Sequence, residues 1–207
     1  MKKMSMLTLA SLFVAGTATA QEPVAADAPF TFRPMLVIGI ATGGDEMGEL
    51  TYETGDSTEV SAGGGITLGG GFEVQSADKP FGATVTINYH SDSATASNAD
   101  ITMDRFEFTV LPYYQLNEQI QVSAGLSMHT GVELEVDFEG TETLEFDSAL
   151  ATIVELRYLF ETGDMTLSGR FTSVEYEPTS YNGRSVSGGE VVDGSNLGLF
   201  FTWSFNN

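Results

Sequence analysis

The sequence has no cysteine and few basic residues. Its 207 residues include 8 Lys and Arg against 29 Asp and Glu, giving a formal net charge of −21 at pH 7. Without cysteine, no disulfide can hold the fold together. So acidic a chain repels phosphates, which excludes nucleic acid as a partner. Contact with an anionic surface would need bridging divalent cations or a local basic patch.

Long apolar runs and helical periodicity are also absent after residue 20. No segment there approaches 18 consecutive apolar residues, so we expect no transmembrane helix. The glycine-rich stretch Val60–Gln75 lacks the Lys and the following helix of a phosphate-binding loop.

The first twenty residues have the pattern of a secretory signal peptide. Lys2 and Lys3 precede the mostly apolar run Met6–Gly16, and Ala18 and Ala20 form a small-x-small cleavage pattern. We therefore expect residues 1–20 to be a signal peptide, residues 21–32 a periplasmic segment and residues 33–207 one domain. Loss of Lys2 and Lys3 leaves 6 cations against 29 acids, a net charge of about −23.

Apolar and polar residues alternate in eight segments, a pattern typical of strands with two unlike faces. The expected strands are Pro34–Ala41, Val60–Gln75, Phe81–His90, Arg105–Tyr114, Ile120–His129, Leu150–Phe160, Leu167–Val174 and Asn196–Phe205.

The connections between these segments alternate between short and long. The short joins are residues 76–80, 117–119 and 161–164, and the long polar ones are residues 42–59, 91–100, 130–146 and 177–194. An even number of strands with short turns at one rim is typical of an antiparallel up-and-down outer-membrane β-barrel. Both termini would then be periplasmic and the long loops extracellular.

A soluble sandwich or barrel is the alternative, with the apolar face turned inward. Two features oppose it. The polar face is mainly Ser, Thr, Gly, Asn and Gln, whereas solvated sheet faces usually carry many Lys and Glu. The apolar face carries aromatics near strand ends, as interfacial girdles do. With lipid outside, we expect the inward glycines Gly63, Gly65, Gly69 and Gly71 to leave room for longer side chains in a narrow interior.

The last strand resembles the C-terminal targeting strand of bacterial outer-membrane barrels. The residues that carry this resemblance are Asn196, Gly198, Phe201, Trp203 and Phe205, followed by two further asparagines. From Arg33 to Phe205 the chain is similar to the small eight-stranded OmpA/OmpX-like barrels, without a peptidoglycan-binding domain. The resemblance implies recognition by the outer-membrane assembly machinery and periplasmic chaperones.

Six charged residues fall on the expected inward face. They are Glu73, Arg105, Glu107, Glu155, Arg157 and Arg170. Confined charges are costly unless paired, so we expect a salt-bridged network in the lumen. Such a network either plugs the barrel or forms a gate for ions.

His90 and His129 also point inward, near the rim with the long loops. Some outer-membrane barrels modify lipid A with a His, a Ser and an acid. The sequence YHSDSA around His90 lacks the His-x-Ser pattern of the deacylases. We expect polar rim histidines and no enzymatic activity.

Glu133, Glu135, Asp137 and Glu139 alternate with apolar residues, which predicts a hairpin that continues beyond the membrane and turns near Gly140. No EF-hand-type Ca²⁺ loop is present. The apolar face of this hairpin is a candidate adhesive edge.

The sequence thus predicts a monomeric outer-membrane barrel with acidic loops, in contact with outer-membrane lipid and lipopolysaccharide and needing no cofactor. Its expected role is envelope integrity or surface contact. A narrow conduit for ions is the first alternative, and a lipid A-modifying enzyme the second.

Overall fold

The computed structural model describes residues 30–52, 57–77, 80–96, 99–161 and 163–205, and these form an all-β structure. Among them, no helix is long and apolar enough to cross a membrane. The expected signal peptide and most of the 21–32 segment lie outside the described residues.

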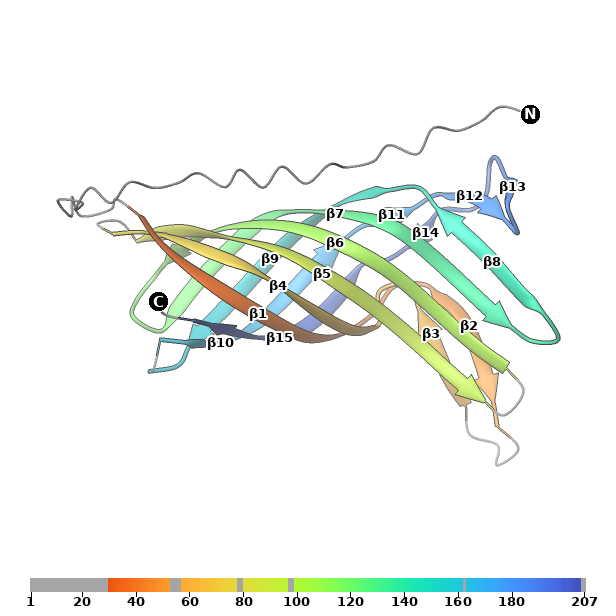
Figure 1. Cartoon of the computed structure of the whole chain (residues 1–207), viewed down its shortest axis with the longest axis horizontal. Coiled ribbons are helices and arrows are strands. Elements are labelled where there is room, and N and C mark those ends of the chain that lie inside the picture. Colours follow the sequence, from red (N-terminus) through yellow and green to blue (C-terminus); the bar gives the residue numbers. More distant parts are fainter. Residues whose placement is uncertain (1–29, 53–56, 78–79, 97–98, 162, 206–207) are drawn as a thin grey trace, which may run out of the picture.

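Eight long antiparallel strands form a closed barrel (Figure 1). Each strand pairs with the next in the chain order of these eight, and the last pairs with the first through Met35↔Ser204 to Thr42↔Leu197. The eight are β1 (Phe30–Thr42), β4 (Gly65–Ser76), β5 (Phe81–Ala96), β6 (Ala99–Gln115), β7 (Ile120–Asp137), β9 (Ala149–Leu159), β10 (Met165–Ser173) and β15 (Asn196–Ser204). The prediction of an eight-stranded up-and-down barrel is confirmed.

Seven shorter strands lie at one end, which we call the cap end; the start of β1 and the end of β15 lie at the other, the turn end (Figure 1). The short strands are β2 (Glu46–Thr51), β3 (Ser57–Ser61), β8 (Thr141–Phe146), β11 (Glu175–Tyr176), β12 (Pro178–Tyr181), β13 (Arg184–Ser185) and β14 (Val192–Asp193). The cap consists of these strands and the far ends of β5, β6 and β7.

The outer surface of the barrel is apolar. Leu36, Val154 and Leu197 are exposed over 55%, 62% and 62% of their surfaces, while Thr, Ser and charged side chains of the same strands are buried inside. Aromatic pairs lie near both ends of this belt, Tyr89 with Phe106 and Trp203 with Phe205. A soluble barrel would have its apolar side chains inside and its polar side chains outside. This barrel has the opposite arrangement, as predicted for an outer-membrane barrel.

The glycine-rich segment is not one strand, contrary to prediction. β3 ends at Ser61, a turn follows, and β4 begins at Gly65, whose φ of +111° favours glycine. Val60 and Ala62 therefore do not face outward but are fully buried in the cap.

The role predicted for the four inward glycines is also largely wrong. A Cβ on Gly63 would lie 2.8 Å from the Gly43 and Gly194 carbonyls, and one on Gly65 or Gly71 would overlap β5 backbone. These glycines allow backbones to approach each other; only Gly69 also makes room for a lumen side chain, Asn88. Interior room for a large ring comes instead from Gly39 and Gly198, which flank Phe200.

The expected long loop at residues 91–100 is also different. β5 and β6 continue as a paired ladder to Ala96↔Ala99, so residues 91–96 and 99–100 are strand rather than loop. The strand β1 begins at Phe30, before the expected domain start at residue 33. The hairpin predicted around Gly140 is present as β7 and β8, with the turn between Asp137 and Thr141.

A buried apolar core holds the cap together. It consists of Val60, Ala62, Ala94, Ile101, Met103, Val132, Leu134, Phe146, Ala151, Val174 and Tyr176. Val132 and Leu134 point into this core, so the apolar face proposed as an adhesive edge is buried at these two positions. The large apolar side chain of the β7–β8 hairpin that is strongly exposed is Phe138, at its tip.

A β-bulge turns the apolar face of β7 inward. Phe106 pairs with Thr130 but Asp104 pairs with Glu133, so β7 has an extra residue at Gly131, whose φ is +59°. The bulge changes which residues face inward, from His129 below it to Val132 above it.

Truncating the cap core is expected to destabilise the protein. Phe146→Ala removes a buried ring and should cost about 3 kcal/mol, measured by urea-induced unfolding of the refolded protein. The exposed Phe138→Ala in the same hairpin is the control and should change stability by less than about 0.5 kcal/mol. If Phe146→Ala changed the free energy of unfolding as little as Phe138→Ala, the cap core would not contribute to stability.

Candidate functional site

The barrel interior near the cap contains one carboxylate surrounded by basic side chains. Arg105 Nε donates to Glu107 Oε1 at 3.0 Å, and Arg105 Nη1 donates to the Ala62 carbonyl at 2.8 Å. The two residues are two positions apart on β6, so both side chains point to the same face of the strand. Both are buried. This upper cluster ties the barrel wall to the turn that follows β3.

Two histidines complete the upper cluster. Glu107 Oε1 lies 3.6 Å from His90 Nδ1 and 3.8 Å from His129 Nε2. The strand register explains this, because His90 is paired with Arg105 and Glu107 with His129 across adjacent strands.

Each histidine has further partners. His90 is hydrogen-bonded to Thr67 Oγ1 at 2.8 Å and to the Gly64 carbonyl at 2.5 Å, and His129 Nδ1 to the Tyr176 hydroxyl at 2.7 Å. Tyr176 lies in the cap, where burial raises the pKa of its hydroxyl above the ordinary value. The tyrosine therefore keeps a proton that it can donate to His129.

A second cluster lies nearer the turn end. Arg33 Nε donates to Glu73 Oε2 at 3.1 Å, and Arg170 Nε donates to Glu155 Oε2 at 2.7 Å. Each pair sits directly opposite in its strand register, Arg33↔Glu73 and Arg170↔Glu155. Arg157 lies between them, 3.8 Å from Glu73 and 3.5 Å from Glu155. This lower cluster links strands β1, β4, β9 and β10.

Aromatic rings pack against the interior arginines. The Arg170 guanidinium lies 4.0 Å from the Phe200 ring centroid, and that of Arg157 lies 5.3 Å from Tyr113. A ring face attracts a guanidinium and fills space beside it. Phe200 and its neighbours Met35 and Val37 form a small apolar cluster in the lumen.

The structure places the six predicted lumen residues in the interior but divides them between two clusters. Arg105 and Glu107 belong to the upper cluster, and the other four to the lower one. Sequence reasoning missed Arg33. It has the same parity as Met35 and Val37, so alternation along β1 carried the signal. The expected start of the strand at Pro34 excluded it.

His90 and His129 face the lumen and are buried, so neither lies on the outer surface of the barrel. The YHSDSA segment therefore offers no His-Ser arrangement on that surface. Among the described residues, no group of three or more His, Asp or Glu side chains has a geometry that could hold a metal ion.

The surface of the cap is strongly acidic. Arg184 is its one described surface cation. Hydrogen bonds from the Ser195 side chain and from the Ser195 N–H, the latter at 2.8 Å, lower the pKa of the Asp193 carboxyl. Eighteen carboxylates lie in the described cap segments: Asp45, Glu46, Glu49, Glu59, Asp92, Asp100, Asp104, Glu133, Glu135, Asp137, Glu139, Glu142, Glu145, Asp147, Glu175, Glu177, Glu190 and Asp193.

The closing strand β15 separates the residues of the expected assembly signal by face. Asn196 and Gly198 point into the barrel, and Phe201, Trp203 and Phe205 lie on the outer surface. Trp203 and Phe205 stack with ring centroids 5.4 Å apart.

Comparison with solved structures finds the same fold. The chain is similar to Ail, the attachment invasion locus protein of Yersinia pestis, in a crystal structure with the heparin analogue sucrose octasulfate, at 11% identity and a TM-score of 0.53. A second Ail structure gives 11% and 0.51; each match covers 84% of this chain and 97% of Ail. Neisserial surface protein A matches at 12% identity and a TM-score of 0.46, over 85% of this chain and 99% of that one.

No curated protein sequence matches the chain. A family model does: the outer membrane protein β-barrel domain matches residues 7–205. With its closed barrel, apolar belt and polar interior, this chain belongs to the outer-membrane β-barrel family, whose place is the outer membrane.

Proposed function

We propose that this protein is a non-enzymatic outer-membrane barrel that supports the envelope and makes surface contacts through its acidic cap. The observation that carries the proposal is the cap surface itself, where eighteen carboxylates lie over an apolar core, thirteen of them on paired strands. Residues on a rigid scaffold present charge at fixed positions, which favours recognition over simple solubility.

The proposed orientation puts the cap outside the cell and both termini in the periplasm. Barrels of this class have short turns on the periplasmic side and longer segments outside. The expected signal peptide agrees with this direction of export. We further propose that β15 is read by the assembly machinery and that the barrel is a monomer.

The charge of the cap selects the chemistry of its partner. The Ail structure contains sucrose octasulfate, a polyanion. The cap of this chain repels such a ligand, because its surface has one described cation against eighteen carboxylates. A basic polypeptide is complementary to the acidic cap. Lipopolysaccharide phosphates would bind it only through bridging divalent ions.

Polycation binding tests this proposal. The refolded protein should bind polylysine and not heparin, and added salt should weaken the binding. Replacing Glu133 and Glu135 by Gln should weaken it about threefold to tenfold, measured by titration.

The control, Glu118→Gln with Glu161→Gln, makes the same change in net charge at the turn end. Equal loss in both double variants would show that only the overall charge matters and not the cap.

The interior supports a plug rather than an open channel. Every described interior arginine has a carboxylate within 4.0 Å, and the apolar cap core covers one end of the lumen. A conduit is the second candidate, and one observation favours it: Arg157 lies 3.5 Å or more from both of its carboxylates. Such a side chain can exchange partners more readily than Arg105 or Arg170.

Planar-bilayer conductance separates plug from conduit. We expect the wild-type barrel to be silent, because paired charges and an apolar cap exclude a continuous water path. Discrete openings that change in Glu107→Gln would instead establish the conduit.

Removal of Arg105 should destabilise the barrel. Arg105→Ala leaves Glu107 buried without its closest cation, which should cost about 3–5 kcal/mol in urea-induced unfolding. Arg184→Ala, on the exposed edge strand β13, is the matched control and should have little effect. If Arg105→Ala unfolded at the same urea concentration as wild type, Arg105 would make no net contribution to the stability of the barrel.

A further inference from the structure

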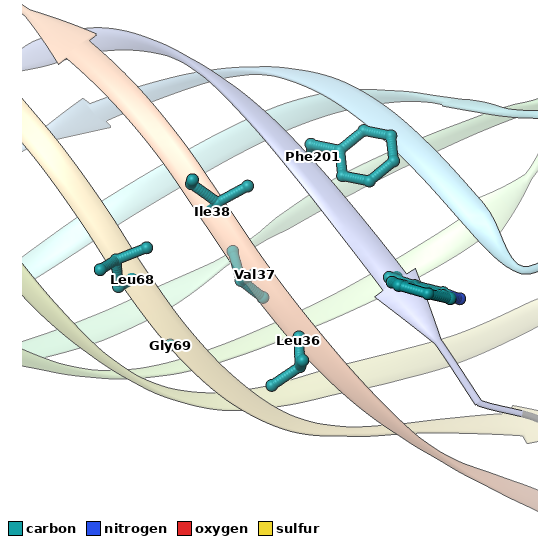
Figure 2. Close-up of a pocket in the computed structure, with 7 residues that line it drawn as sticks. Leu36, Val37, Ile38, Leu68, Gly69 and Phe201 are labelled. Carbon is teal, nitrogen blue, oxygen red and sulfur yellow. The ribbon is translucent and has the colours of Figure 1, made fainter.

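The lipid-facing surface is hollowed along the seam between β1 and β15. The first hollow has a volume of about 450 Å³. It is lined by Leu36 and Ile38 of β1, Leu68 of β4, and Phe201 and Trp203 of β15 (Figure 2). A second, of about 180 Å³, shares Ile38 and Phe201 with it.

A third hollow, of about 490 Å³, continues the same line toward the cap. It shares Ile40 and Leu199 with the second and ends at Thr42 and Leu197. The three hollows therefore follow one another along the seam between β1 and β15, and together we call them the seam groove. Its length along β15 from Leu197 to Trp203 is about 20 Å, at about 3.3 Å per residue.

The third hollow exists because one side chain is missing from an apolar row. Across neighbouring strands the row runs Ile66, Ile40, Leu199, Gly169 and Leu156. The four large side chains are exposed over 54–60% of their surfaces. Gly169 is the gap between two leucines.

Nothing in the described protein requires glycine at position 169. A Cβ there would meet no atom within 4 Å, and the backbone does not adopt a positive φ. Glycine inside a strand weakens it, because its backbone has more freedom to lose and no side chain to pack. The space over Gly169 is therefore open to an occupant from outside the chain.

The position of the groove decides the chemistry of that occupant. It lies within the apolar belt, between the aromatic residues near the two ends of the barrel, and no charged side chain lines it. It is long, and its middle hollow is the smallest, which suits a thin chain better than a helix about 10 Å across. The belt is already the surface that meets lipid, so the groove continues an existing interface.

We propose that the seam groove binds one acyl chain of a membrane phospholipid. The acyl chain lies along β1 and β15 from Trp203 toward Leu197 and fills the gap at Gly169. Recognition is by shape and apolar contact, so the bound lipid is selected by its chain and not by its headgroup.

Native mass spectrometry of the refolded protein, released from detergent micelles containing dioleoylphosphatidylglycerol, tests the site. Wild type should retain one phospholipid, and Gly169→Leu, which fills the gap, should retain it about tenfold less. Ala124→Leu is the matched control, since it enlarges a small exposed residue of β7, on another part of the barrel wall. It should retain lipid as wild type does.

Equal retention in all three proteins would overturn the proposal. So would a dimer of wild type that Gly169→Leu converts to monomer, because the occupant would then be a second copy of the chain. Misfolding is not an expected confound, since the added side chain meets no atom at its Cβ; heat-modifiable gel mobility checks it.

Trp203 provides a second readout, because it is the one tryptophan of the chain and lines the first hollow. Phosphatidylglycerol with brominated oleoyl chains should quench the fluorescence of Trp203. In wild type and Ala124→Leu, this quenching should saturate at a low mole fraction of the brominated lipid. In Gly169→Leu, quenching should rise only in proportion to the mole fraction. Proportional quenching in wild type would contradict a specific site.

Discussion

The pairing of β1 with β15 is the contact on which the rest of the structure depends. It joins the ends of the sheet and closes the ring, so no barrel strand keeps an open edge along the apolar belt. Closure at eight strands makes the interior narrow. Charged side chains that point inward must then lie close together, which is why Arg157 of β9 lies 3.8 Å from Glu73 of β4 although these two strands are not neighbours.

The two ends of the closed barrel have different interiors. At the turn end and in the middle, mainly polar and ionic side chains fill the lumen, with a small apolar cluster around Phe200, and most apolar residues face lipid. Above the bulge at Gly131, β7 reverses its faces, and Val132 and Leu134 point inward while the acidic residues stay outside. One extra residue in β7 thus changes a strand whose apolar face meets lipid into one whose apolar face packs against the buried cap core.

These two halves support different parts of the function that we propose. The paired lumen keeps the barrel closed and rigid, and the cap core holds the acidic strands in place. The seam groove is independent of both, since it lies on the lipid side and depends on a missing side chain at Gly169. Surface contact, lumen filling and lipid contact therefore rest on separate sets of residues.

Much of the fold could be predicted from the sequence, because a strand places alternate residues on opposite faces. Alternation identified the eight barrel strands, their inward charges Glu73, Arg105, Glu107, Glu155, Arg157 and Arg170, and the apolar outer belt. It failed where the period shifts or the chain turns, at Gly63–Gly65 and beyond Gly131, since a bulge or turn of one residue exchanges the faces.

What the sequence by itself determined is the face on which each side chain of a regular strand lies. The tertiary structure decided which strand segments meet and at what height. That is why Glu107 lies near both histidines, why Arg33 joins Glu73, and why apolar residues from β3, β6, β7 and β11 form one cap core. Alternation is local, whereas these contacts depend on the register between strands, which the alternation within a single strand does not specify.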